Sequence, residues 1–147
     1  MKEEINIGLY LRIISKEIKQ LVDKKLDNDL TNIQIGILCY INKAPKKQIY
    51  QKDIEQFLKV RRSTTTEILS TMERKKLIKR VEEQTDKRKK IITLTKEGKN
   101  KVKKFQEIIT EINNNLLNDI TKEQQKNLQN SLEQIRKNIK NLQEEIW

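Results

Sequence analysis

"LIKRVEEQTDKRKKIITLTKEG", which runs from Leu77 to Gly98, contains two β-favouring segments on either side of a block of cations. The segments LIKRVEE and KIITLT predict a β-hairpin. Their alternation is imperfect, but it offers the following apolar residues for the inner face: Ile78, Val81, Ile91 or Ile92, and Leu94. At the tip, one acidic residue is followed by four adjacent cations, Asp86, Lys87, Arg88, Lys89 and Lys90. The four cations repel one another, so this tip needs an external partner that neutralises them.

Two short helices are predicted directly before the hairpin. The first, Tyr50 to Phe57, is followed by Leu58, and its apolar residues share one face. The second, Ser63 to Lys75, has inward-facing spacing at Thr65, Ile68, Leu69 and Met72. Two short helices separated by a few residues are typical of a helix-turn-helix. The centre of the chain therefore predicts a helix-turn-helix followed by a hairpin.

Four further helices are predicted around these elements. An amphipathic pattern runs through INIGLYLRIISKEIKQLVDKKL, residues 5–26, and is broken by Asp27 to Asp29. A second helix is predicted from the N-cap Thr31 to a point before KAPKK, where Pro45 prevents continuation. After the hairpin, a long helix is expected from about Lys99. A last helix begins at Thr121, which forms a predicted capping box with Gln124.

The last helix carries a heptad seam that requires a partner helix. Its apolar residues are spaced by four and three, at Leu128, Leu132, Ile135, Ile139, Leu142 and Ile146. The first helix has a similar stripe that includes Leu11, Ile14 and Ile18. Such stripes can be covered within one chain, but a small central core flanked by two long terminal helices favours a second copy. We therefore expect these residues to form a homodimer interface.

The net charge of +11 is concentrated in the middle of the chain. Residues 43–103 contain 20 Lys and Arg against eight Asp and Glu, whereas the remainder is nearly balanced. This distribution predicts a polyanionic partner. Solvated helix faces are the alternative interpretation, because a lysine-rich composition alone can produce them.

Composition excludes several function classes. The chain has no histidine and one cysteine, Cys39, so a disulfide framework, the usual zinc sites and a histidine-based triad are ruled out. No metal or cofactor is expected, and no nucleophile–base pair or phosphate-cradling loop suggests an enzyme. The chain also lacks a long apolar run and a secretory signal pattern, which predicts a cytoplasmic protein without a membrane segment.

The ordered motifs of the chain resemble those of the MarR family of bacterial transcription regulators. The similarity begins at LTxxQ (Leu30, Thr31, Gln34) and continues through LKVRRSTTTEILSTMERKKLIKR. Its most specific part is the series Leu77, Ile78, Arg80, Asp86, Arg88, Leu94, Thr95 and Gly98. The resemblance implies a single, mainly α domain with a small β-hairpin wing. Residues 30–98 would form a winged helix-turn-helix, flanked by dimerisation helices in residues 1–28 and 99–147.

The resemblance also implies a function. Members of this family are homodimers, most often repressors, that bind pseudo-palindromic double-stranded DNA, and some are released by a small aromatic or anionic effector. The fourth helix would be the recognition helix in the major groove, with DNA-facing residues Arg62, Ser63, Thr64, Thr66 and Glu67. The wing would reach the minor groove through Arg88, oriented by Asp86, where narrow A·T-rich DNA concentrates negative potential.

Four positions depart from the family pattern. Tyr50 and Arg61 replace the usual hydroxyl caps, at a cost of about 1 kcal/mol each. Lys76 replaces a glycine and is expected to need a left-handed conformation. Glu67 replaces an arginine, so its carboxylate repels phosphate unless it pairs with a neighbour such as Arg62 or accepts from cytosine N4.

Three alternatives remain open at the level of sequence. Some family members sense oxidants through cysteine, but Cys39 lies on an apolar helix and is interpreted as a core residue. Tyr10 and Tyr40 are candidates for an effector pocket or for ordinary packing. The winged helix could also dock an acidic protein partner, an interpretation supported by Glu67 and the missing caps. RNA binding is a weaker variant, because base-stacking aromatic residues make up only 4% of the chain.

Overall fold

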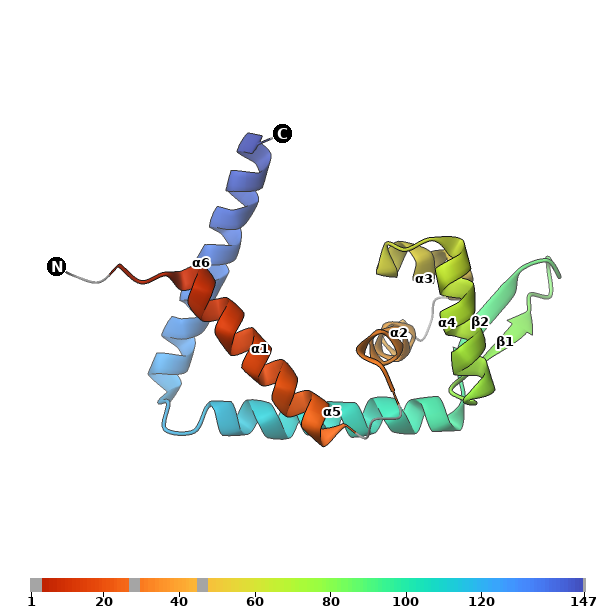
Figure 1. Ribbon diagram of the computed structural model, residues 1–147, viewed down its shortest axis with the longest axis horizontal. Coiled ribbons are helices and arrows are strands. Elements are labelled where there is room, and N and C mark those ends of the chain that lie inside the picture. Colours follow the sequence, from red (N-terminus) through yellow and green to blue (C-terminus); the bar gives the residue numbers. More distant parts are fainter. Residues whose placement is uncertain (1–3, 27–29, 45–47, 147) are drawn as a thin grey trace. The chain divides into compact units, whose positions relative to one another are not determined.

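The computed structural model describes residues 4–26, 30–44 and 48–146. Within these ranges the chain forms six helices and one β-hairpin (Figure 1). The elements are α1 (Ile7–Lys25), α2 (Asn32–Asn42), α3 (Gln51–Leu58), α4 (Arg62–Arg74), β1 (Ile78–Glu82), β2 (Lys90–Leu94), α5 (Lys96–Leu116) and α6 (Lys122–Ile146). This confirms the predicted mainly α fold with a hairpin. The helix breaks expected at Asp27 to Asp29 and at Pro45 lie outside the described residues.

The chain divides into two compact units, which we describe separately. The first ends at Thr110 and the second begins at Glu111, so α5 contributes to both. The first contains the helix-turn-helix and the hairpin, and the second contains α6. None of the helices in the described part of the chain is apolar over a length sufficient to span a lipid bilayer.

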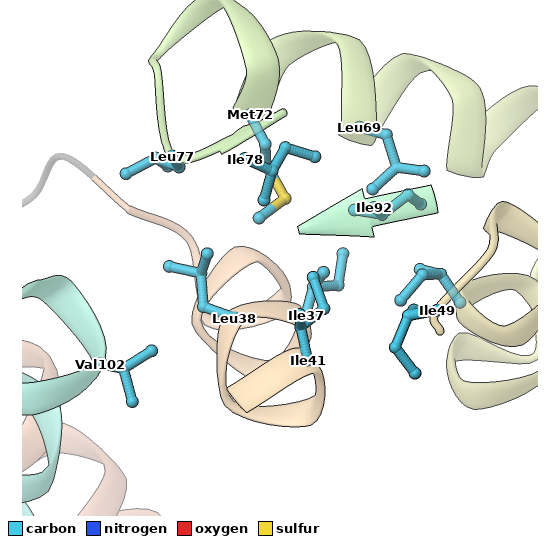
Figure 2. Close-up of a cluster of buried hydrophobic side chains, with 11 residues drawn as sticks. Ile37, Leu38, Ile41, Ile49, Leu69, Met72, Leu77, Ile78, Ile92 and Val102 are labelled. Carbon is cyan, nitrogen blue, oxygen red and sulfur yellow. The ribbon is translucent and has the colours of Figure 1, made fainter. Parts of the chain in front are cut away.

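A hydrophobic core holds α2, α3, α4 and the hairpin together. Side chains of α4 and β2 converge with those of α2 (Figure 2). The fully buried apolar residues are Ile37, Leu38, Ile49, Ile54, Leu69, Met72, Ile78 and Ile92. In α4, Thr65 is also buried and Ile68 is partly buried, as their spacing predicted. Because the inner face of α4 is fixed by this core, its outer face is left available to a partner.

The starts of α2 and α6 have the predicted caps. The hydroxyl of Thr31 accepts from the Gln34 N–H, and the Gln34 side chain accepts from the Thr31 N–H, which completes a capping box. Thr121 and Gln124 form the same pair at α6. At α4, the N-cap Arg61 makes no side-chain cap, as expected. At α3, the missing hydroxyl cap is partly offset, because the Asp53 carboxylate accepts the Tyr50 N–H at 2.9 Å.

The hairpin register corrects one predicted core residue. Ile78 pairs with Leu94, and Arg80 pairs with Ile92. Since successive strand residues point to opposite faces, Val81 faces away from Ile78 and is 45% exposed. The prediction that Val81 faces inward is therefore wrong, and Ile92 is the buried residue of the Ile91/Ile92 alternative.

The turn from α4 into β1 confirms the expected left-handed conformation at Lys76, whose φ is 58°. The Lys76 N–H bonds to the Glu73 carbonyl at 2.9 Å, and the Leu77 N–H bonds to the Met72 carbonyl at 3.0 Å. This pair of hydrogen bonds is a Schellman motif. Met72 and Leu77 also belong to the core, so the motif fixes where β1 leaves α4.

Helix α5 begins at Lys96, three residues before the predicted start near Lys99. Thr95 explains the difference, because its hydroxyl accepts the Gly98 N–H at 3.0 Å and donates to the Lys76 carbonyl at 2.6 Å. A Cβ atom at Gly98 would collide with the carbonyl oxygen of Leu77. This close approach joins the start of α5 to the α4–β1 turn and requires a glycine.

The apolar stripes of α1 and α6 are largely exposed within the single chain. In α6, Leu128, Leu132, Ile139 and Leu142 are exposed and Ile135 is half-buried. The side chain of Ile146 lies outside the described residues. In α1, Leu11 and Ile14 are exposed, Ile18 is half-buried and Val22 is buried. The described residues of one chain therefore leave most of the predicted seam uncovered.

Candidate nucleic-acid interface

The outer face of α4 carries all five residues predicted to face a partner. Arg62, Ser63, Thr64, Thr66 and Glu67 are exposed, whereas the intervening Thr65 is buried. An α-helix turns by about 100° per residue, so these positions spread over the side of α4 that points away from the core. The face offers one guanidinium, three hydroxyl-bearing side chains and one carboxylate.

The wing tip is organised by Asp86. One oxygen of its carboxylate accepts from the Arg88 backbone N–H at 3.1 Å and from the Arg88 Nε at 3.2 Å. The Arg88 side chain is 92% exposed, so this ion pair adds little to stability. The ion pair instead restrains the orientation of the guanidinium, because it holds the Arg88 Nε atom. Lys87, Lys89 and Lys90 are also exposed around the same tip.

A cleft of about 660 Å³ lies between the start of α3, the start of α4 and the wing. Its charged lining consists of six cations and two carboxylates: Lys52, Arg62, Arg80, Arg88, Lys89, Lys90, Asp53 and Glu55. The structure thus brings Arg62 of the predicted recognition helix and Arg88 of the predicted wing to one cleft. A concave surface with excess positive charge attracts anionic ligands, and phosphate groups are anions of this kind.

The phenol of Tyr50 lines the same cleft. Its pKa is raised by desolvation and, to a smaller extent, by the Glu83 and Asp53 carboxylates. The phenol donates a hydrogen bond to the Gln48 amide oxygen at 2.7 Å. This residue was predicted only as a missing cap, and sequence offered no signal for its place beside the wing.

Arg80 ties the wing to α4. Its Nη2 donates to the Ser70 hydroxyl at 3.2 Å, and its Nε lies 3.4 Å from a carboxylate oxygen of Glu73. The Arg80 side chain is only 18% exposed. In the sequence, Arg80 was merely part of a family motif, and Ser70 had no assigned role. Strand alternation from Ile78 was the available signal, since it places Arg80 on the inner side of β1.

Gln51 joins α3 to α4. Its side-chain amide donates to the Thr66 hydroxyl at 2.8 Å and to the Glu55 carboxylate at 3.1 Å. The Thr66 hydroxyl in turn donates to the Arg62 carbonyl at 2.9 Å. With its hydroxyl engaged in this way, Thr66 has its methyl group left for contact with a partner.

Glu67 does not form the ion pair with Arg62 that was considered from sequence. Neither side chain takes part in a hydrogen bond or ion pair with another described residue. Five residues along an α-helix correspond to about 140° around its axis, so the two side chains leave α4 on different sides. The carboxylate of Glu67 is consequently available to a ligand.

Cys39 and Tyr40 belong to the packing of the domain. Both lie against the core, and the Tyr40 ring stacks on Phe57 with 4.5 Å between ring centroids. Burial raises the pKa of the Cys39 thiol, although the nearby Lys43 ammonium partly opposes this. A raised pKa disfavours the reactive thiolate. The described residues also contain no group of three or more acidic or cysteine side chains that could hold a metal ion.

Comparison with known proteins identifies a family and a relative whose structure has been solved several times. The MarR family model matches residues 28–89. S. aureus MepR, a transcription regulator of the multidrug efflux pump MepA, is 30% identical to this chain, with a TM-score of 0.81 and coverage of 92% of this chain and 99% of MepR. The search of curated proteins found no match.

Two further MepR structures were solved with bound molecules. A MepR–DNA complex is 32% identical, covers 90% of this chain and 98% of its own, and has a TM-score of 0.75. MepR bound to ethidium bromide is 31% identical, covers 95% of this chain and 99% of its own, and has a TM-score of 0.71.

Proposed function

Because this chain belongs to the MarR family of winged-helix transcription regulators, we propose that it binds double-stranded DNA sequence-specifically, as a homodimer, and represses transcription from a pseudo-palindromic operator. One observation carries the proposal: the exposed start of α4 and the cationic wing tip line the same basic cleft. MepR has been solved in complex with DNA, which supports DNA binding by this chain. Regulators of this family are generally not enzymes, and we assign no catalytic residue.

In this proposal α4 is the recognition helix and the hairpin is the wing. Helix α4 enters the major groove with Arg62, Ser63, Thr64, Thr66 and Glu67, which contact base edges or phosphates. The wing residues Lys87, Lys89 and Lys90 neutralise phosphates, and Arg88 enters the minor groove. The DNA phosphates then relieve the repulsion between the wing cations, so DNA is the external partner that the tip needs.

Homodimer formation is proposed from the uncovered apolar stripes of α1 and α6. A heptad seam such as that of α6 buries its apolar residues against a second helix. The two recognition helices of a dimer would lie roughly 34 Å apart, so that they read half-sites one turn of DNA apart. The protein would act in the cytoplasm.

DNA binding is tested by fluorescence anisotropy with the duplex upstream of the protein's own coding region and a scrambled duplex of equal composition. Arg88→Ala should greatly weaken selective binding. Arg136→Ala is the matched control, since it removes the same side chain from an exposed position of α6. Equal, weak binding of both duplexes, together with a stoichiometric complex with an acidic protein, would instead support the winged helix as a protein-docking module.

The electrostatic part of the proposal predicts a steep salt dependence. If about 6 to 10 phosphates are contacted, the affinity should fall by roughly 10³- to 10⁵-fold between 50 and 200 mM salt. The plot of log affinity against log salt concentration should be less steep for Arg88→Ala than for Arg136→Ala. Affinity that does not change with salt would contradict a role for the wing cations in phosphate binding.

The dimer is tested by placing a charge in the α6 seam. Ile139→Lys should shift sedimentation toward the monomer, because a lysine at a seam position must be desolvated against the partner helix. Asn130→Lys introduces the same side chain at an exposed position outside the seam and should leave the dimer intact. A dimer that survives Ile139→Lys would show that α6 does not form the interface.

We also propose that a small aromatic or anionic effector releases the protein from DNA. MepR has been solved with ethidium bromide, an aromatic ligand. An effector can shift the DNA-competent population only if it binds one conformation more tightly than the other. Titration of such ligands into the protein–DNA complex, followed by anisotropy, tests this: loss of binding supports release, and unchanged binding across aromatic and anionic ligands contradicts it.

A further inference from the structure

Glu67 lies on the outward face of α4. The buried residues of this helix include Thr65 and Leu69, which lie two positions before and after Glu67. Two residues correspond to about 200° around the helix axis, so both buried side chains leave nearly opposite to Glu67. In a recognition helix that enters the major groove, this position faces the floor of the groove, where the base edges lie.

Among the residues that the structure describes, no cation pairs with the Glu67 carboxylate. Neighbours on a helix face are three and four residues apart, and at these positions α4 has Ser63, Thr64, Ser70 and Thr71. All four are uncharged hydroxyl residues. Arg74, two turns further along, donates instead to the Thr71 hydroxyl at 3.1 Å. The structure therefore removes the first of the two roles considered from sequence, an ion pair with a neighbouring residue.

A carboxylate that enters the groove needs a hydrogen-bond donor, because otherwise it loses its hydration without replacement and is repelled by phosphates. In the major groove, amino-group donors are cytosine N4 and adenine N6. The adenine donor lies beside the N7 acceptor, which repels a carboxylate, whereas the cytosine donor has no acceptor on the same base edge. Cytosine is consequently the better partner.

We infer that Glu67 is a specificity-determining residue that accepts a hydrogen bond from the N4 amino group of a cytosine in each half-site. The inference rests on the proposed DNA binding and names one feature of the operator. Glu67 thus selects against duplexes that lack the cytosine, since these leave an unpaired carboxylate at the floor of the groove. Its contribution is mainly to discrimination between sequences.

The test is selection from a library of randomised duplexes, followed by sequencing, with wild type, Glu67→Gln and Glu67→Ala. Wild type should select a C·G pair at one position of each half-site. Glutamine can pair with adenine N6 and N7, so Glu67→Gln should shift that position toward adenine and leave the others unchanged. Glu67→Ala should lose the preference there. Glu123→Gln, an exposed carboxylate in the first turn of α6, is the matched control and should select as wild type does.

Anisotropy with single-pair variants of the selected duplex then measures the effect. Replacement of the C·G pair by T·A should weaken wild-type binding by about tenfold and Glu67→Ala binding by less than about twofold. Identical selected sequences for wild type and both Glu67 variants would overturn the inference while leaving DNA binding intact. If wild type selects no sequence at all, the proposed function fails as well, so the two failures are distinguishable.

Discussion

Lys76→Gly should stabilise the protein although it removes a side chain. Lys76 has a φ of 58° in the Schellman motif that ends α4. A left-handed conformation costs a residue with a Cβ atom roughly 1–2 kcal/mol, and glycine avoids this. Glycine's greater freedom in the unfolded chain opposes the gain by about 0.4–1 kcal/mol. The net expected increase in the free energy of unfolding is therefore about 0.5–1 kcal/mol.

This prediction is measured as a thermal shift at fixed protein concentration, because association with a second copy would make the Tm concentration-dependent. For a chain of this size the expected shift is about 1–4 °C upward. Lys76→Ala is the control, since it removes the same lysine side chain but keeps the Cβ atom and its strain. A Lys76→Gly protein no more stable than Lys76→Ala would refute the argument that the turn is strained.

Two other substitutions and one chemical modification test individual sites. Asp86→Asn should weaken binding of a selective duplex in the anisotropy assay although it removes a negative charge, because Arg88 loses the carboxylate that orients it; tighter binding would contradict this role. Gly98→Ala should lower the free energy of unfolding by about 1–3 kcal/mol in urea denaturation, since its Cβ collides with the Leu77 carbonyl, and an unchanged midpoint would show that α5 can shift. The Cys39 thiol should react with iodoacetamide more slowly than the thiol of glutathione does at pH 7.5, because burial raises the Cys39 pKa, and its reaction rate should increase only at higher pH. A reaction faster than that of glutathione would indicate a sensing cysteine.

Much of the fold could be predicted because its signals are local. The Thr31 and Thr121 capping boxes depend on residues three positions apart. The left-handed turn at Lys76 was predicted from the resemblance, because the family has glycine at this position. The inward positions of α4 follow from helical periodicity alone. In each case the sequence pattern and the tertiary packing favour the same conformation.

The errors arose where distant parts of the chain decide the local structure. Val81 is apolar, but the register set by Ile78 and the core places it on the outside. Helix α5 begins early because the Thr95 hydroxyl accepts the Gly98 N–H, and the bond from the same hydroxyl to the Lys76 carbonyl, 19 residues away, holds this cap in place. The contacts of Arg80 with Ser70 and Glu73 also depend on how β1 packs against α4. Strand alternation indicates which side of β1 Arg80 faces, but the sequence does not indicate which residues of α4 it contacts.

These same long-range contacts determine how the interface can move. Arg80 joins β1 to α4, Gln51 joins α3 to α4, and the Thr95 hydroxyl joins the start of α5 to the α4–β1 turn. The wing is therefore tied to the C-terminal half of the recognition helix, and α3 is tied to its N-terminal half. A change that tilts the wing alone would break the contacts of Arg80 with Ser70 and Glu73, whereas rotation of the whole winged helix preserves them. We therefore expect an effector to act on the spacing between the two winged helices of a dimer, and Arg80→Ala, which frees the wing, to weaken DNA binding without abolishing release by the effector.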